Sequence, residues 1–320
     1  METPLITVGI TCFNAEDTIE RAVRSALNQR WPNLEVVVVD DRSTDGSFDV
    51  VEKLARDDTN LKIVRQDTNT GPAGARNAVL ENASGEFVAF FDDDDESVSE
   101  RIATQYRRIA SYERETGQTL VACYASGRRV YPNGYSIGIE AIGSRPEIPK
   151  GEEVADYILF NGKRPGVFYG GGTPTCALMT RMSVFDTVGR FDPSFRRVED
   201  AEFAIRLARC GGHFIGCPEK LYTQHATFAA DKSATMNFEA EMKMIEKNRD
   251  YLERRKRYHY AKNWFRFRYH HFAGETGKML VALVRAWIRH PILVTRHFLA
   301  SAPARLLHEI RMKRKSTLAK

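Results

Sequence analysis

A run of four acidic residues, Asp92–Asp95, is the feature of this chain that says most about its chemistry. The run follows directly on an apolar, strand-like segment, Glu86–Phe91. Carboxylates crowded at the end of a buried strand repel one another, which is unfavourable unless a cation lies among them. Asp95 could instead cap a helix expected to begin near Val98, but one cap does not need four acids. The run therefore predicts a divalent metal that carries a phosphate.

The elements that must position these acids are predicted by short apolar runs alternating with helical periodicity over residues 1–125. Helices between the strands, the first with Asn14 as its cap, indicate an α/β fold with a Rossmann-like, mainly parallel sheet flanked by helices. Ligands of such sheets bind beyond the carboxyl ends of the strands, where the acids are. The expected strands are Leu5–Ile10, Leu34–Val39, Leu61–Val64, Glu86–Phe91 and Leu120–Tyr124.

Two further polar segments should lie at the same edge. Asp40 and Asp41 end the second strand, and although Ser43 or Asp45 can cap the next helix, capping does not explain the doubled acid. An acid there is well placed to accept a hydrogen bond from a nucleotide base or ribose. The segment Asn69–Asn77 enters a helix, with a proline early and an arginine in the first turns, which favours an anionic phosphate but equally fits an ordinary helix start.

These segments, in this order and spacing, resemble the family-2 glycosyltransferases, inverting nucleotide-sugar enzymes of the GT-A fold. The resemblance extends to about Thr227. The chain departs from the family at Arg42, where glycine is usual, and in its unbroken run of four acids. The matching segments are Val8–Asn14, Val38–Ser47, Asn69–Asn77 and Gly85–Asp95.

On the donor side, the resemblance implies that Thr11 and Phe13 border the nucleotide base, that Asp41 reads its edge and that Arg76 lies near the donor. The family's D-x-D element matches Asp92-Asp93-Asp94.

Within that element the resemblance implies that Asp94 binds Mg²⁺ or Mn²⁺ directly, with Asp92 as a further ligand. Asp92 and Asp93 would also bind the donor's ribose, sugar or metal-bound water. His225 matches a histidine near the metal or diphosphate, although a lone histidine after a strand is equally often structural.

On the acceptor side, the segment Gly189–Leu207 resembles the part of the family in which a Glu-Asp pair opens a helix. The resemblance makes Asp200 the general base, with Glu199 beside it binding the acceptor or supporting the base. An acceptor hydroxyl must lose its proton as it attacks the anomeric carbon, so a carboxylate is required. Without the resemblance, the pair is simply an acidic first turn.

We expect residues 1–235 to form the catalytic domain, with 1–125 as the nucleotide-sugar half and 126–235 as the acceptor half. Residues 126–175 are rich in glycine and proline and are expected to be irregular. Within them, Gly170–Gly172 either lets substrate approach the backbone or is a bare turn. Regular structure should resume at Cys176–Thr180, with helices near Met182–Val188 and Asp200–Cys210.

The five cysteines are an odd number, scattered and without metal-binding spacing, which indicates reduced thiols. No secretory signal is expected at the N-terminus. Both observations predict a cytoplasmic protein.

The remaining residues, 236–320, are predicted to be a basic, amphipathic helical extension. From Arg254 onward the chain has 17 lysines or arginines against two acids, a net +15 that leaves the first 253 residues at −10. Basic and aromatic residues interleave over Arg254–His271, a composition that fits nucleic acid or a membrane surface.

The stretch Met279–Arg289 favours the membrane, because Lys278, Arg285 and Arg289 make a narrow cationic stripe on an otherwise apolar helix. A polybasic cluster, Arg311–Lys315, would add attraction to anionic lipid. The alternative is that the apolar faces pack on the catalytic domain or a second subunit.

The sequence thus predicts an inverting glycosyltransferase that uses Mg²⁺ or Mn²⁺ to move a sugar from a nucleotide diphosphate donor, a UDP-sugar, to a glycan or lipid-linked glycan. We expect it to be peripheral at the inner face of the cell membrane and not to bind nucleic acid. The rivals are a nucleotidyltransferase and a nucleic-acid-binding protein that uses the basic tail. The sugar, acceptor, linkage and oligomeric state do not follow from the sequence.

Overall fold

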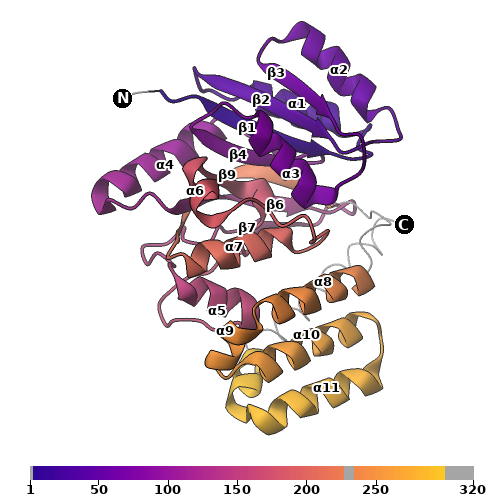
Figure 1. The fold of residues 1–320 in the computed structure, drawn as a ribbon, viewed down its shortest axis with the longest axis vertical. Helices are drawn as coiled ribbons and strands as arrows, with labels where there is room; N and C mark the ends of the chain where they lie inside the picture. Colours follow the sequence, from indigo (N-terminus) through magenta and orange to yellow (C-terminus); the bar gives the residue numbers. More distant parts are fainter. Residues whose placement is uncertain (1–2, 227–233, 300–320) are drawn as a thin grey trace. The chain divides into compact units, whose positions relative to one another are not determined.

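The computed structural model describes residues 3–226 and 234–299. The chain divides into two compact units (Figure 1). The first consists of residues 1–130, 137–155 and 163–225, and the second of residues 131–136, 156–162 and 226–320. The assignment of donor and acceptor halves to 1–125 and 126–235 stays a prediction.

One nine-stranded sheet organises the first unit. Its strands run in the order β3-β2-β1-β4-β8-β6-β9-β5, with β7 paired to β6. The segment from β3 to β4 is wholly parallel, whereas β8 is antiparallel to both of its neighbours. The strands are β1 (Ile6–Cys12), β2 (Leu34–Asp40), β3 (Leu61–Arg65), β4 (Phe87–Asp92), β5 (Glu96–Ser97), β6 (Val121–Val130), β7 (Ser136–Ile139), β8 (Leu178–Arg181) and β9 (His213–His225).

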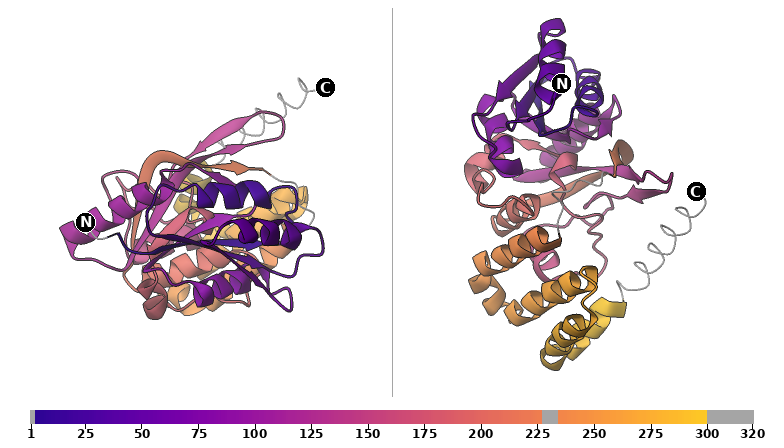
Figure 2. Two further views of the ribbon diagram at one scale, coloured as in Figure 1. Left: turned by 90° about the horizontal axis from the view of Figure 1, so that it is seen from above. Right: turned by 90° about the vertical axis from the view of Figure 1, so that its right-hand side faces the viewer.

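Helices flank this sheet on both sides (Figure 2). Strand β2 contributes four consecutive, fully buried valines, Val36–Val39, as expected for a central parallel strand covered on both faces. The predicted α/β fold with a sheet flanked by helices is therefore confirmed. The helices of the first unit are α1 (Ile19–Leu27), α2 (Ser47–Asp57), α3 (Gly71–Asn82), α4 (Arg101–Thr116), α6 (Ser183–Val188) and α7 (Glu199–Arg209), and α5 (Glu152–Phe160) begins in the first unit and ends in the second.

Two of the predicted caps are wrong. Helix α1 begins after Thr18, and the side chain of Asn14 instead accepts a hydrogen bond from the Thr44 backbone at 2.8 Å, which ties the β1–α1 loop to the β2–α2 loop. Helix α4 begins at Arg101 rather than near Val98. Asp95 is buried six residues earlier and is not its cap.

The segment 126–175 is more regular than its composition predicted. Strand β6 continues to Val130, β7 pairs with it, and α5 follows. Gly170 has φ +56°, and a Cβ there would lie 2.4 Å from the Glu140 carbonyl oxygen, so this glycine is required by a close backbone approach within the protein.

The second unit is helical, as predicted for the chain beyond Asn237. Helix α10 packs against both α8 and α11, and residues 291–299 form a further helix. Among the described helices none is long and apolar enough to cross a membrane. The cluster Arg311–Lys315 lies outside the described residues. The unit contains α8 (Ala234–Lys247), α9 (Arg249–Arg254), α10 (Tyr258–Phe272) and α11 (Thr276–Arg289).

Candidate active site

The carboxyl ends of β2, β1 and β4 lie side by side, as the sequence predicted. In the register of the parallel strands, Cys12 at the end of β1 lies opposite Asp40 of β2, and Thr11 lies opposite Asp92 of β4. The backbone N–H of the exposed Phe13 donates to Asp93 Oδ2 at 3.1 Å, joining the β1 loop to the acid run. Three of the predicted polar segments therefore meet at one edge of the sheet.

Asp41 organises the loop that leads into α3. Its Oδ1 accepts hydrogen bonds from the backbone of Thr70 at 2.7 Å and from Gln66 at 2.8 Å, and its Oδ2 accepts from Gly71 at 2.8 Å. Burial raises the pKa of this carboxyl, and the Thr70 and Gly71 bonds oppose that rise. Asp41 thus holds the loop before α3 in place. Its predicted hydrogen bond to a nucleotide base stays a prediction.

Arg76 lies in the interior of the site, with only 8% of the residue exposed. Its guanidinium forms an ion pair with Glu199 and lies 3.8 Å from Asp92 Oδ1. Burial alone would lower the pKa of Arg76, but the carboxylates of Glu199 and Asp92 raise it. Much of the positive charge that was predicted to meet a donor phosphate is therefore balanced by protein carboxylates.

The acids of the run differ in their surroundings. Burial raises the pKa of Asp93 to about 8. The negative charges of Asp94 and Asp92 raise it further, whereas the hydrogen bond from the Phe13 backbone lowers it. Burial also raises the pKa of Asp95 to about 8, helped by the charges of Asp92 and Asp94. Neither carboxylate oxygen of Asp95 accepts a hydrogen bond of normal geometry from the described residues.

Glu199 and Asp200 open α7, directly after Val198 in the left-handed conformation at φ +57°. A β-branched residue is strained there, so the surrounding packing must hold the turn. Burial and the neighbouring Glu199 raise the pKa of Asp200 to about 6, while Arg76 lowers it. A carboxylate with that pKa is ionised at neutral pH and still basic enough to take a proton.

The family model for "Glycosyl transferase family 2" matches residues 7–185. That span is more than half of the chain and includes all the segments at the sheet edge. The chain belongs to glycosyl transferase family 2.

Two curated proteins illustrate what the chain is similar to. Succinoglycan biosynthesis protein ExoO of Rhizobium meliloti is 37% identical over 225 residues, 69% of this chain and 61% of its own. GalNAc(5)-diNAcBac-PP-undecaprenol beta-1,3-glucosyltransferase of Campylobacter jejuni is 41% identical over 120 residues, 37% of this chain and 39% of its own. The chain spans about two fifths of the length of several such relatives.

Among solved structures, S. aureus TarS 1–349 in complex with UDP-GlcNAc superposes with a TM-score of 0.61 at 21% identity. The superposition covers 91% of this chain and 82% of TarS 1–349. This likeness supports the fold assigned above.

At residue 42, where this chain has arginine in place of the family's usual glycine, the backbone is strained. Arg42 follows Asp41 with φ +66°, the left-handed backbone that glycine adopts without strain. An L-residue with a Cβ is disfavoured there by about 1 kcal/mol. The loop therefore keeps a shape that suits glycine.

A divalent cation fits the acid run. Among the described residues, ligand atoms of Asp92, Asp95 and Cys176 lie within 4.8 Å of one another. The oxygens suit Mg²⁺ or Mn²⁺, whereas a thiol suits softer ions. The buried carboxyl of Asp95 supports a cation here, because its raised pKa of about 8 means that its charged form is costly unless a cation lies close to it.

The other predicted ligands, Asp94 and His225, are not members of this group. His225 ends β9, and its buried Nε2 has no hydrogen-bond partner among the described residues. Burial and the charge of Arg21 lower the pKa of this imidazole, which favours the neutral form that binds metals. Its role as a ligand stays a prediction.

Two buried or partly buried arginines near the acids, Arg101 and Arg21, carry no signal in the sequence. Arg101 is fully buried and donates to the carbonyl oxygens of Phe90 at 3.0 Å and Cys176 at 2.7 Å. Arg21 donates to the Asp94 carbonyl oxygen at 2.7 Å. Both arginines lie on helices without any recognisable motif, so only the tertiary structure reveals them.

Proposed function

We propose that this chain is a metal-dependent, inverting glycosyltransferase that moves a sugar from a UDP-sugar to a hydroxyl of a glycan or lipid-linked glycan. The observation that carries the proposal is Arg76, whose guanidinium contacts both Asp92 of the acid run and Glu199, the neighbour of Asp200. Membership of the family and the UDP-GlcNAc named for TarS support this donor class.

On the donor side, Thr11 and Phe13 would border the nucleotide base, with Asp41 at its edge. Asp92 and Asp93 would contact the ribose, the sugar or metal-bound water. Arg76 would act near the donor mainly by holding Asp92 in place.

The cation would be Mg²⁺ or Mn²⁺, held by Asp92, Asp94 and Asp95 with His225. When bound, it stabilises negative charge on the departing nucleotide diphosphate. Asp95 joins this set because its ligand oxygen lies within 4.8 Å of the ligand atoms of Asp92 and Cys176, and its carboxylate accepts no hydrogen bond of normal geometry among the described residues.

On the acceptor side, Asp200 would take the proton of the attacking hydroxyl. The new bond joins that oxygen to the anomeric carbon, the bond to the diphosphate oxygen breaks on the opposite side, and its electron pair leaves with the nucleotide. Glu199 supports the base, because its carboxylate is engaged with Arg76.

The enzyme would act while bound peripherally to the inner face of the cell membrane. The undecaprenol-linked glycan named for the Campylobacter relative supports a lipid-linked acceptor. The basic, apolar helices of the second unit support the location.

The test is transfer from a panel of nucleotide sugars with Mn²⁺ present. Asp200→Asn should lower turnover about 10²–10⁴-fold while donor binding, followed by thermal shift, is nearly unchanged. Asp186→Asn, an exposed acid on α6, is the matched control. Transfer retained by Asp200→Asn would overturn the assignment of the base.

The same assays separate the rival functions. A nucleotidyltransferase would cleave at the α-phosphate and would not need Asp200. A nucleic-acid-binding protein would show salt-sensitive binding of RNA or DNA that survives Asp94→Ala.

A further inference from the structure

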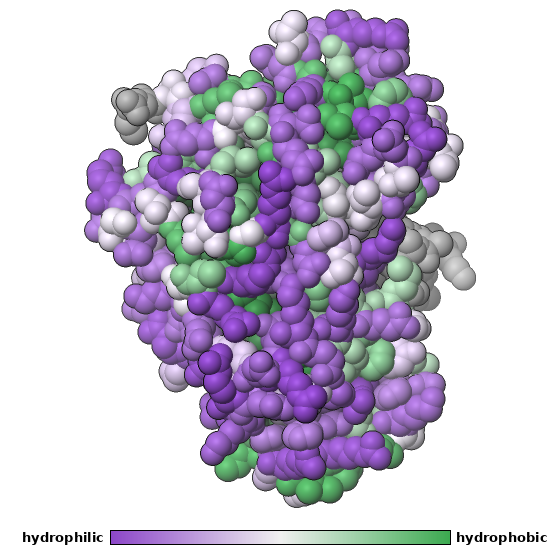
Figure 3. Space-filling model, viewed as in Figure 1, coloured by the Kyte–Doolittle hydropathy of each residue, from purple (hydrophilic) through white to green (hydrophobic). Residues whose placement is uncertain are grey.

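One side of α11 carries large apolar residues that face solvent, and Ile292 at the start of the next helix is exposed as well. Helix α11 contacts α10 through its opposite side, where Ala282 and Ala286 are buried. Green, hydrophobic surface gathers over this end of the helical unit in Figure 3. We call the exposed side the docking face, and its residues are Leu280, Val281, Val284, Trp287, Ile288 and Ile292.

The exposure of the docking face is larger than a surface helix normally tolerates. Its first four residues are between 50% and 52% exposed, and Ile288 and Ile292 reach 69% and 76%. Monomeric proteins rarely leave a contiguous apolar patch of this kind uncovered, and such patches mark partner or membrane sites. Trp287 is suited to a membrane interface, where its ring is buried and its N–H stays near polar groups.

Cations border the docking face. At 3.6 residues per turn, Lys278, Arg285 and Arg289 fall within about 40° of one another, between the exposed apolar side and the packed side. Lys278 forms an ion pair with Glu275 at 2.8 Å, whereas no acidic residue occurs from Thr276 to Leu299. Long basic side chains in this position extend their charges to lipid headgroups while their stems cover apolar surface.

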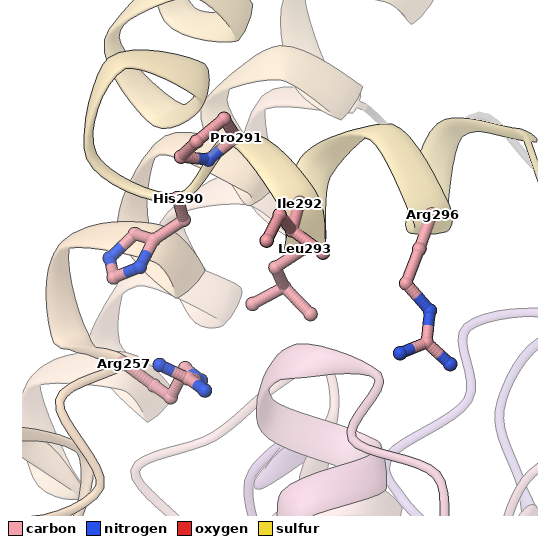
Figure 4. Close-up of a pocket in the computed structure, with 6 residues that line it drawn as sticks. All are labelled: Arg257, His290, Pro291, Ile292, Leu293 and Arg296. Atoms are coloured by element: carbon pink, nitrogen blue, oxygen red, sulfur yellow. The ribbon is translucent and has the colours of Figure 1, made fainter.

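A pocket of about 340 Å³ lies beside the docking face in the same unit (Figure 4). Arg257, His290 and Arg296 line it together with Pro291, Ile292 and Leu293. In Figure 4 the guanidinium groups of Arg257 and Arg296 lie on either side of the Leu293 side chain, so the pocket adds two separate cations beside aliphatic surface.

We propose that the docking face, bordered by these cations, binds a lipid bilayer that contains anionic phospholipid. This inference extends the proposed function, since it rests on an acceptor presented at the membrane. A second copy of the chain is a poorer occupant, because a two-fold contact would bring Arg285 and Arg289 of both copies together with no acid on the segment to neutralise them.

The first experiment measures sedimentation of the full chain with vesicles of phosphatidylcholine, alone or mixed with phosphatidylglycerol. The double variant Val284→Glu, Ile288→Glu should lower binding about ten-fold or more, because both side chains lose apolar burial. Met236→Glu, at an exposed apolar position on α8, is the matched control and should bind like the wild type. Unchanged binding of the double variant overturns the proposal.

The cations are tested separately. Arg285→Gln and Arg289→Gln should each lower binding to the anionic vesicles about five-fold and leave binding to neutral vesicles almost unchanged. Equal binding of wild type and variants to both kinds of vesicle would contradict the role given to the arginines.

A measurement on the wild type avoids dependence on variant folding. Brominated phosphatidylcholine should quench the fluorescence of Trp287, and Trp287→Phe should remove most of the quenching. No quenching despite vesicle binding would place the contact elsewhere. A dimer in sedimentation velocity that the Val284→Glu, Ile288→Glu variant abolishes, with no vesicle binding by the wild type, would assign the docking face to a second copy.

Transfer to a water-soluble acceptor distinguishes this proposal from the enzymatic one. The docking variants should keep wild-type transfer in solution, so loss of vesicle binding alone reports on the surface. Absence of transfer by the wild type, with vesicle binding intact, would instead contradict the proposed function.

Discussion

The guanidinium of Arg76 on α3 forms a buried ion pair with Glu199, the first residue of α7. The two residues are separated by 123 positions in the chain. Because Arg76 also lies 3.8 Å from Asp92, this contact links the predicted metal site to the predicted base. Arg76 is therefore one of the contacts that set the spacing between the two regions, together with the hydrogen bonds of Asn77 to Phe191 and of Arg196 to Asn69.

Removal of one partner of this pair should be strongly destabilising. Arg76→Met leaves the buried Glu199 and the partly exposed Asp92 without this counter-charge, so we expect a loss of about 3–5 kcal/mol in chemical denaturation. Arg76→Met with Glu199→Met should cost less than the sum of the single changes.

The exposed pair of Arg24 and Glu20 on α1 is the control for that measurement. Arg24→Ala should cost about 0.5 kcal/mol or less. If Arg76→Met cost no more than Arg24→Ala, the ion pair would not have the structural importance given to it here.

The pH profile of transfer should report the base. Asp200 must be deprotonated to accept a proton, and its pKa is about 6, so kcat/KM should fall about ten-fold per unit below that pH. The charge of Glu199 raises the pKa of Asp200, hence Glu199→Gln should move the acidic limb of the profile to lower pH. A shift in the opposite direction would contradict the assignment.

The metal-free protein should lose stability as the pH rises. The pKa of Asp95 is about 8 in the folded state and 3.8 for an ordinary aspartate in water, so the folded state holds a proton that the unfolded state releases. The stabilisation from this proton is complete below about pH 4 and is lost as the pH rises through about 8. Thermal melts across this range should therefore decline.

Asp95→Asn should flatten this decline and should abolish the rise in Tm that Mn²⁺ produces in the wild type. Asp17→Asn, at an exposed position, should change neither property. If Mn²⁺ raised the Tm of Asp95→Asn as much as that of the wild type, Asp95 would not be a metal ligand.

The loop after β2 offers a stabilising change. Arg42→Gly should raise the free energy of unfolding by about 0.5–1 kcal/mol, because glycine adopts φ +66° without strain. Arg42→Ala keeps a Cβ and should give no such gain in the same denaturation assay. Equal stability of all three proteins would mean that the backbone strain is relieved by another contact.

The sequence predicted those parts of the fold that local pattern determines. The buried valines of β2 and the alternation with helices specified the parallel strands and therefore the edge at which Asp41 and the acid run meet. The same pattern did not reveal that Arg76 is paired with Glu199, since that contact joins distant segments. Burial of Asp95 likewise depends on neighbours such as Cys176 that come from another part of the chain.

The most direct test is transfer of labelled sugar from a UDP-sugar to a lipid extract by wild type and Asp200→Asn, each with and without Mn²⁺. We expect label in the lipid fraction only for the wild type with the cation present, together with release of an equal amount of UDP. Equal labelling by Asp200→Asn, or wild-type labelling that is independent of the cation, would contradict it.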